Sequence, residues 1–136
     1  MTGRKPQVLF VCVRNGGKSL MAAGLMAQRA GDAFTVRSAG TDPGRSVNAL
    51  AAEALAEVGV DISSEVPKAI TPELVRDADL VITLGREAQV GTVPGTAFES
   101  WDTDEPSARG IDGIERMRLV RDDIAWRVDE LYRRLT

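Results

Sequence analysis

Two patterns of apolar residues alternate along the chain. Near-continuous apolar runs, typical of strands buried on both faces of a parallel sheet, cover residues 7–13 and 80–84. Weaker strand patterns cover residues 34–38 and 97–101. Between these runs, apolar residues recur every three or four positions, which is the period of an amphipathic helix. The pattern therefore predicts strands separated by helices.

Four helices are expected between and after the strands. Ser19 is predicted to cap the first helix, which ends near Gly31, and a second helix covers residues 47–58 with Gly59 as its stop. A cap, a first-turn proline and an early acid predict a short helix over residues 72–77. The arginines of the last helix are expected to form its solvent-exposed face. Its apolar stripe consists of Ile114, Met117, Val120, Ile124, Val128, Leu131 and Leu135.

This order of elements predicts one fold class. Strands that alternate with helices, joined by right-handed crossovers, give a three-layer α/β domain with a four-stranded parallel sheet and helices on both faces. The 136 residues, 43% of them hydrophobic, are expected to form a single domain over residues 1–136. Ligands of such sheets bind at the carboxyl ends of the strands. Cys12, where the first strand ends, marks the expected site.

Composition removes several classes of function. The net charge of −3, with interspersed signs, argues against a nucleic-acid partner. One cysteine and no histidine exclude an internal disulfide, a Cys/His dyad, a Ser/His/Asp triad and nearly every zinc site, so neither a metal nor a bound cofactor is expected. A polar start and one short apolar run predict no secretory signal and no membrane span, hence a cytoplasmic protein.

The loop between the first strand and the first helix is predicted to hold a tetrahedral oxyanion. Backbone N–H groups and the helix terminus attract anions there. Gly16 and Gly17 let the backbone approach a ligand, Lys18 adds a charge and Ser19 a hydroxyl. A cation and a helix N-terminus also favour the thiolate form of Cys12, which makes it a candidate nucleophile. The expected site consists of Cys12, Val13, Arg14, Asn15, Gly16, Gly17, Lys18 and Ser19.

Three other interpretations use the same residues. A lone cysteine on a core strand is often a small buried hydrophobe, but such a cysteine does not need the glycines, lysine and serine that follow here. A nucleotide-binding P-loop shares the sequence Gly17-Lys18-Ser19, but its first glycine falls on Cys12 and the run 80–84 ends in Gly85 rather than in a magnesium-binding aspartate. A non-enzymatic oxyanion-binding module would not need the thiol of Cys12.

Taken together, the motifs resemble the low-molecular-weight protein tyrosine phosphatase superfamily and, within it, the arsenate reductases of that fold. The family motif C-x-x-N-x-x-R-S/T is present as Cys12, Asn15, Lys18 and Ser19. The resemblance spans nearly the whole chain and implies a low-molecular-weight phosphatase-like fold. Further matching segments are residues 38–41, 57–63, 67–68, 78–84 and 101–106.

The resemblance also implies a role for particular side chains. In that family the cysteine is the nucleophile, the asparagine and serine support the thiolate, and an acid before a proline transfers a proton. These roles fall on Cys12, Asn15, Ser19 and Glu105, with Asp104 as the adjacent second candidate for the acid.

Two departures from the family pattern make tyrosine phosphatase activity the alternative. Lys18 stands where the family usually has arginine, and an ammonium is a point charge whereas a guanidinium binds an oxyanion with two parallel hydrogen bonds. Aromatic residues that would flank a phosphotyrosine ring are also missing: Val13 and Arg14 follow the cysteine, and Ser107 follows the proline.

The cysteine count points to an external thiol. Family arsenate reductases that use thioredoxin have two further cysteines, whose positions fall on Gly85 and near Thr92. Reduction of arsenate takes two electrons, so one thiol is not sufficient. The loop sequence and the missing cysteines are similar to actinobacterial arsenate reductases that join arsenate to mycothiol. This resemblance implies arsenate as substrate, mycothiol as thiol co-substrate and a mycoredoxin as reductant.

Overall fold

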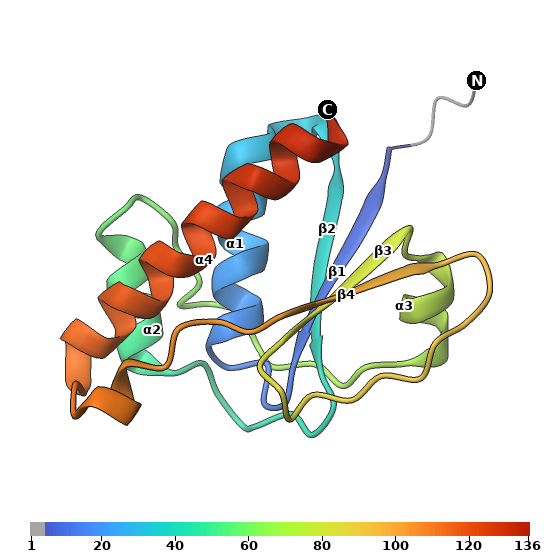
Figure 1. The fold of residues 1–136 in the computed structure, drawn as a ribbon. Coiled ribbons are helices and arrows are strands. Elements are labelled where there is room, and N and C mark those ends of the chain that lie inside the picture. The colour runs from blue at the N-terminus through green and yellow to red at the C-terminus, as the bar shows by residue number, and fades with distance from the viewer. Residues whose placement is uncertain (1–4) are drawn as a thin grey trace.

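The computed structural model describes residues 5–136 and arranges them in three layers (Figure 1). Strands β1 (Gln7–Cys12), β2 (Thr35–Gly40), β3 (Leu80–Leu84) and β4 (Ala97–Trp101) form one parallel sheet in the order β2-β1-β3-β4. The two last strands have the predicted bounds, and the first two differ by one or two residues at their ends. Residues 1–4, part of the polar start considered above, lie outside the described residues.

Helices cover both faces of the sheet (Figure 1). Helices α1 (Lys18–Ala30), α2 (Ala49–Ala56) and α4 (Gly113–Leu135) lie on one face, and α3 (Pro72–Asp77) lies on the other. Two short 3₁₀ helices, which the apolar pattern does not reveal, follow α1 and precede α4. The predicted three-layer α/β fold with a four-stranded parallel sheet is therefore confirmed.

The alternation of side chains along β1 explains its continuous apolar run. Val8, Phe10 and Cys12 belong to the core under the helices α1, α2 and α4, whereas Leu9 and Val11 belong to the smaller core under α3. Because both faces of the strand are covered, its residues do not alternate between apolar and polar, and both sets are apolar. The same alternation sets Cys12, at the carboxyl end of β1, on the side of α1 and α4.

The predicted helix ends are correct in part. Thr71 caps α3, since its Oγ1 accepts a hydrogen bond from the N–H of Leu74 at 3.1 Å. The second helix is shorter than the apolar period indicated because Asn48 caps it and the chain turns after Ala56. The prediction that Ser19 caps α1 is wrong, because α1 begins at Lys18 with Gly17 at the N-cap and no side-chain cap.

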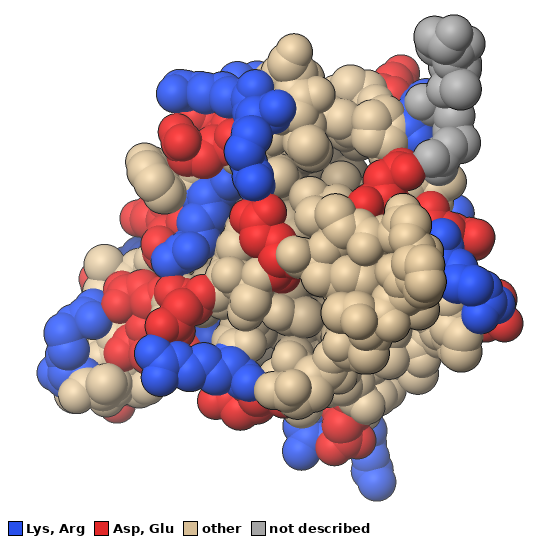
Figure 2. Space-filling view, turned by 45° about the vertical axis from the view of Figure 1, so that its right-hand side comes forward, with Lys and Arg blue, Asp and Glu red and all other residues tan. Residues whose placement is uncertain are grey.

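Ion pairs join α4 to the neighbouring helix. Glu57, just after α2, accepts hydrogen bonds from Arg118 at 2.7 Å and from Arg121 at 2.7 Å. These two guanidinium groups lower the pKa of Glu57 to about 2. On the face in view in Figure 2, Lys and Arg are interspersed with Asp and Glu, as they are along the sequence. Within residues 5–136, no helix is long and apolar enough to cross a membrane.

Candidate active site

The backbone of the loop after β1 is held from outside by residues 41–48, called here the outer segment. Four loop carbonyls accept hydrogen bonds from it, and in a trans peptide the next N–H points the opposite way. The N–H groups of residues 13, 14, 15 and 17 therefore point into the loop. The four bonds run from Thr41 to Cys12 at 3.1 Å, from Asp42 to Val13 at 2.8 Å, from Gly44 to Arg14 at 2.9 Å and from Asn48 to Gly16 at 2.7 Å.

The loop with its inward N–H groups is called here the cradle, and one of these groups reaches the sulfur of Cys12. The N–H of Asn15 donates to the Sγ of Cys12 at 3.2 Å, as the outward carbonyl of Arg14 requires. Cys12 is 8% exposed, so its sulfur lies at the base of the cradle. Backbone N–H groups that converge on one point at a helix N-terminus are a binding arrangement for a tetrahedral oxyanion.

A chain of hydrogen bonds with a defined direction ends on the same sulfur. The backbone N–H of Lys68 can only donate, and it donates to Oδ1 of Asn15 at 2.9 Å. The amide of Asn15 therefore directs Nδ2 to Oγ of Ser19 at 2.7 Å. Ser19 Oγ lies 3.0 Å from Cys12 Sγ, and either atom could donate. Because a thiolate has no proton to donate, an ionised Cys12 would accept hydrogen bonds from both Ser19 and the N–H of Asn15.

Asn15 is held in a backbone conformation that few residues adopt. Its φ is 52°, and it is the one non-glycine residue within the described part of the chain with a positive φ. Asparagine tolerates this region better than most residues, and such conformations are concentrated at functional sites. The side chain is fully buried, so both of its hydrogen bonds are needed. Asn15 therefore has two roles: its backbone shapes the loop, and its side chain orients Ser19.

Gly40, at the end of β2, touches the outer side of the loop. A Cβ there would lie 2.7 Å from the carbonyl oxygen of Val13 and 3.0 Å from the Cβ of Asn15. Real Cβ atoms do not approach backbone oxygens so closely, and Gly40 itself pairs with Cys12 across the sheet. Only glycine leaves room for the loop to fold against β2.

For any reaction at Cys12, Gly40→Ala is expected to lower kcat/KM about a hundredfold. The loop backbone must shift in this variant, and displacements near 1 Å at a reacting group have effects of this size. The control is Gly91→Ala, where an added Cβ meets no atom within 4 Å. Steady-state kinetics and thermal melting of both variants measure the effect. Equal kcat/KM for the two variants would contradict this account of the loop.

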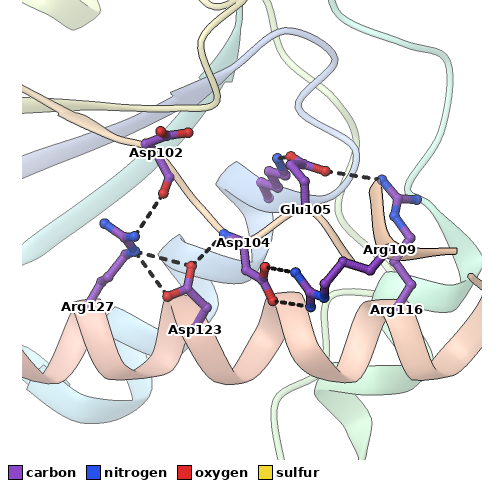
Figure 3. A network of polar contacts seen from close by, with 8 residues as sticks. Asp102, Asp104, Glu105, Arg109, Arg116, Asp123 and Arg127 are labelled. Atoms are coloured by element: carbon purple, nitrogen blue, oxygen red, sulfur yellow. Dashed lines mark hydrogen bonds and ion pairs between the residues drawn. The ribbon is translucent and has the colours of Figure 1, made fainter. Parts of the chain in front are cut away.

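The two candidate acids have different partners. Lys18 Nζ, from the loop, forms an ion pair with Oε1 of Glu105. Asp104 instead faces Arg109, which donates hydrogen bonds to its two oxygens at 2.8 and 3.2 Å (Figure 3). The hydrogen bonds from Arg109 also lower the pKa of Asp104. The structure therefore places Glu105, rather than Asp104, beside the charged residue of the loop.

Helix α4 fixes the segment that carries the acids. Asp123 accepts a hydrogen bond from the N–H of Asp104 at 2.8 Å, and Arg127 donates to the carbonyl oxygen of Asp102 at 2.8 Å (Figure 3). Arg127 also pairs with Asp123 at 3.2 Å. Arg86, which follows β3, donates a hydrogen bond to the carboxyl of Asp102 at 2.7 Å and lowers the pKa of that carboxyl. Residues 102–105 are thus anchored on both sides.

The predicted site residues have different positions in the cradle. Val13, Gly16 and Gly17 contribute backbone, and the side chains of Asn15 and Ser19 act on the sulfur, as described above. The side chain of Arg14 is turned to the surface, where Nη1 pairs with Oδ2 of Asp42 at 2.7 Å and both side chains are mostly exposed. Arg14 therefore lies at the rim.

Sequence reasoning missed several contributors to the cradle. They are the outer segment, the close approach of Gly40, the backbone N–H of Lys68 and the ion pair of Arg116 with Glu105, described below. Residues 38–41 and 67–68, which include Gly40 and Lys68, match the family pattern, but this match does not indicate what their backbones contribute. Among residues 5–136, no group of three or more His, Cys, Asp or Glu side chains could hold a metal ion.

Comparisons with known proteins show to which family the chain is similar. The model of the low molecular weight phosphotyrosine protein phosphatase family matches residues 7–136. An arsenate reductase of Halalkalibacterium halodurans is 37% identical over an alignment of 130 positions, which covers 91% of this chain and 93% of that protein. A structure titled "An arsenate reductase in the phosphate binding state" has a TM-score of 0.80 and 30% identity, covering 96% of this chain and 99% of that one.

A longer relative also has a known structure. The thioredoxin-dependent arsenate reductase of Corynebacterium glutamicum has a TM-score of 0.81 and 35% identity, and the match covers 98% of this chain. The chain spans 63% of the length of that relative. The relative's remaining residues have no counterpart in the match.

Proposed function

The chain belongs to the low molecular weight phosphotyrosine protein phosphatase family, and we propose that within it the chain is an arsenate reductase that joins arsenate to an external thiol. The names of its relatives support the substrate. The observation that carries the proposal is a cradle of inward N–H groups around the chain's single cysteine. A tetrahedral oxyanion fits the cradle, and one thiol supplies only part of the electrons that arsenate reduction requires.

The first step is substitution at arsenic. Arsenate binds the N–H groups of the loop and Lys18, and the thiolate of Cys12 forms a sulfur–arsenic bond while one arsenic–oxygen bond breaks. The departing oxygen takes a proton from Glu105 and leaves as water. The sulfur of mycothiol then displaces Cys12 from arsenic, and the mycothiol proton restores Glu105. Arsenic is still pentavalent in the resulting arseno-mycothiol adduct.

Reduction follows outside the cradle. A thiol of mycoredoxin attacks the sulfur of the adduct, a disulfide bond forms, and the electron pair of the sulfur–arsenic bond stays on arsenic. Arsenite is released, and the two electrons have come from the mycothiol sulfur and the mycoredoxin sulfur. Cys12 ends the cycle as a free thiolate.

A comparison of reductants tests the proposal. Arsenite formation from arsenate is measured with mycothiol and mycoredoxin, with mycoredoxin alone, and with thioredoxin and its reductase alone. We expect arsenite only where mycothiol is present. The thioredoxin arm is the sharpest, because the Corynebacterium glutamicum relative is thioredoxin-dependent. Turnover with thioredoxin alone would contradict the need for a low-molecular-weight thiol.

Lys18→Ala is expected to raise KM for arsenate roughly tenfold or more, because a hydrogen bond to a charged group contributes about 1.5–3 kcal/mol. Lys18→Arg is the matched variant and should raise KM less than Lys18→Ala does, since it preserves the charge. Initial rates over a range of arsenate concentrations give both values. An unchanged KM for Lys18→Ala would mean that the loop N–H groups suffice for binding.

A further inference from the structure

Two cations from different elements hold the carboxylate of Glu105. Lys18 comes from the end of the loop, where α1 begins, and Arg116 comes from the first turn of α4, with its Nη2 3.8 Å from Oε2 of Glu105. In Figure 3, Arg116 reaches Glu105 from α4, whereas the neighbouring Arg109 is turned to Asp104. Each oxygen of Glu105 thus has its own cation.

The side chain of Arg116 is not an ordinary solvated arginine. It is 34% exposed, and its Nε is buried without a hydrogen-bond partner within residues 5–136. By contrast, Arg133 on the same helix is 68% exposed and pairs with acids of α4 itself. Burial of an unpaired guanidinium nitrogen costs free energy, so packing alone does not explain the position of Arg116.

The two cations have different tasks once an oxyanion enters the cradle. The oxyanion and the carboxylate of Glu105 are both negative, so they compete for the ammonium of Lys18. Arg116 lies on α4 rather than on the loop, and it binds the opposite oxygen of Glu105. Its contact therefore does not depend on Lys18. Proton donation leaves a negative charge on Glu105, and a fixed cation beside it stabilises that charge as it develops.

We propose that Arg116 is the positioning residue for Glu105, which it keeps over the cradle and stabilises as the proton leaves while Lys18 binds the oxyanion. This inference rests on the proposed function, in which Glu105 protonates the oxygen that departs from arsenic. Arg116 touches neither arsenate nor Cys12 in this account and acts through Glu105 alone.

Arg116→Gln, Arg116→Lys and the control Arg133→Gln test this role by arsenite formation with mycothiol and mycoredoxin. For Arg116→Gln we expect kcat to fall about tenfold while KM for arsenate changes less than about twofold, because the loss falls on proton transfer rather than on binding. Arg116→Lys should recover most of kcat, and Arg133→Gln should match the unmodified protein. Unchanged kcat in Arg116→Gln would overturn the proposal.

A double-variant comparison separates positioning from a purely structural effect. In a Glu105→Gln background, Arg116→Gln should cause no further loss of kcat, because its effect passes through the carboxylate that is already absent. Losses that multiply would overturn the role, and so would a fall in melting temperature that accounts for the lost activity in Arg116→Gln and Arg116→Lys alike. Absence of arsenite with the unmodified protein would instead overturn the proposed function.

Discussion

Cys12→Ser is expected to abolish arsenite formation, with kcat reduced by at least about a thousandfold, while an oxyanion still binds the loop. A serine hydroxyl is close in size to the thiol and can accept the hydrogen bonds that Asn15 and Ser19 direct at Sγ. It is not ionised at neutral pH, so it cannot attack arsenic. Rates are measured with mycothiol and mycoredoxin, and binding is measured by calorimetry with inorganic phosphate.

The two measurements together distinguish the functions considered for this loop. Retained phosphate binding with lost turnover supports the enzyme. Unchanged turnover in Cys12→Ser would contradict the role of the thiol and favour a loop that works by binding alone. The control is Ser100→Ala, a small change on β4 outside the cradle, which should leave both rate and binding unaltered.

Glu105→Gln is expected to lower kcat about a hundredfold, whereas Asp104→Asn should lower it less than about threefold, because general acid catalysis contributes factors of this order. Both oxygens of Asp104 are bound by Arg109, which lies outside the loop. Glu105 is paired with the loop residue Lys18 instead. Both variants keep size and remove one charge, so they form a matched pair.

Initial rates at saturating arsenate, mycothiol and mycoredoxin give the two kcat values. A larger loss for Asp104→Asn than for Glu105→Gln would contradict the assignment of the acid. Thermal melting serves as the control, since loss of the Asp104–Arg109 ion pair is expected to affect stability more than rate.

Much of the fold could be predicted because local patterns determine it. Residues 80–84 are a strand with the predicted bounds, since Asp79 and Gly85 flank an apolar run there. Residues 97–101, a weaker pattern that includes Glu99 and Ser100, also have the predicted bounds. The end of the second helix was harder, because apolar residues continue beyond Ala56 although the chain already turns. Serine is a residue type that often caps helices, but the hydroxyl of Ser19 forms hydrogen bonds with Cys12 and Asn15 instead. Hydrogen bonds within the loop have overridden the capping preference of this residue.

Apart from Glu105, which the family resemblance supplied, the site could be predicted only where its residues are consecutive. The loop that begins at Cys12 stands out by its glycines and its place after a strand. The outer segment and the backbone N–H of Lys68 have no such signal, because their contribution is a backbone direction that depends on contacts far along the chain. Arg116 follows the polar period of α4, and only the folded chain shows that its position on the helix faces Glu105.

This chain supplies one thiol, and we propose that arsenate reduction requires another from outside. Reduced protein with arsenate and no other thiol tests this most directly, with arsenic speciation by chromatography and mass spectrometry before and after mycothiol and mycoredoxin are added. We expect no arsenite before the addition and sustained arsenite formation after it, because Cys12 is the single cysteine of the sequence. Arsenite in amounts equal to the protein before any thiol is added would contradict the account.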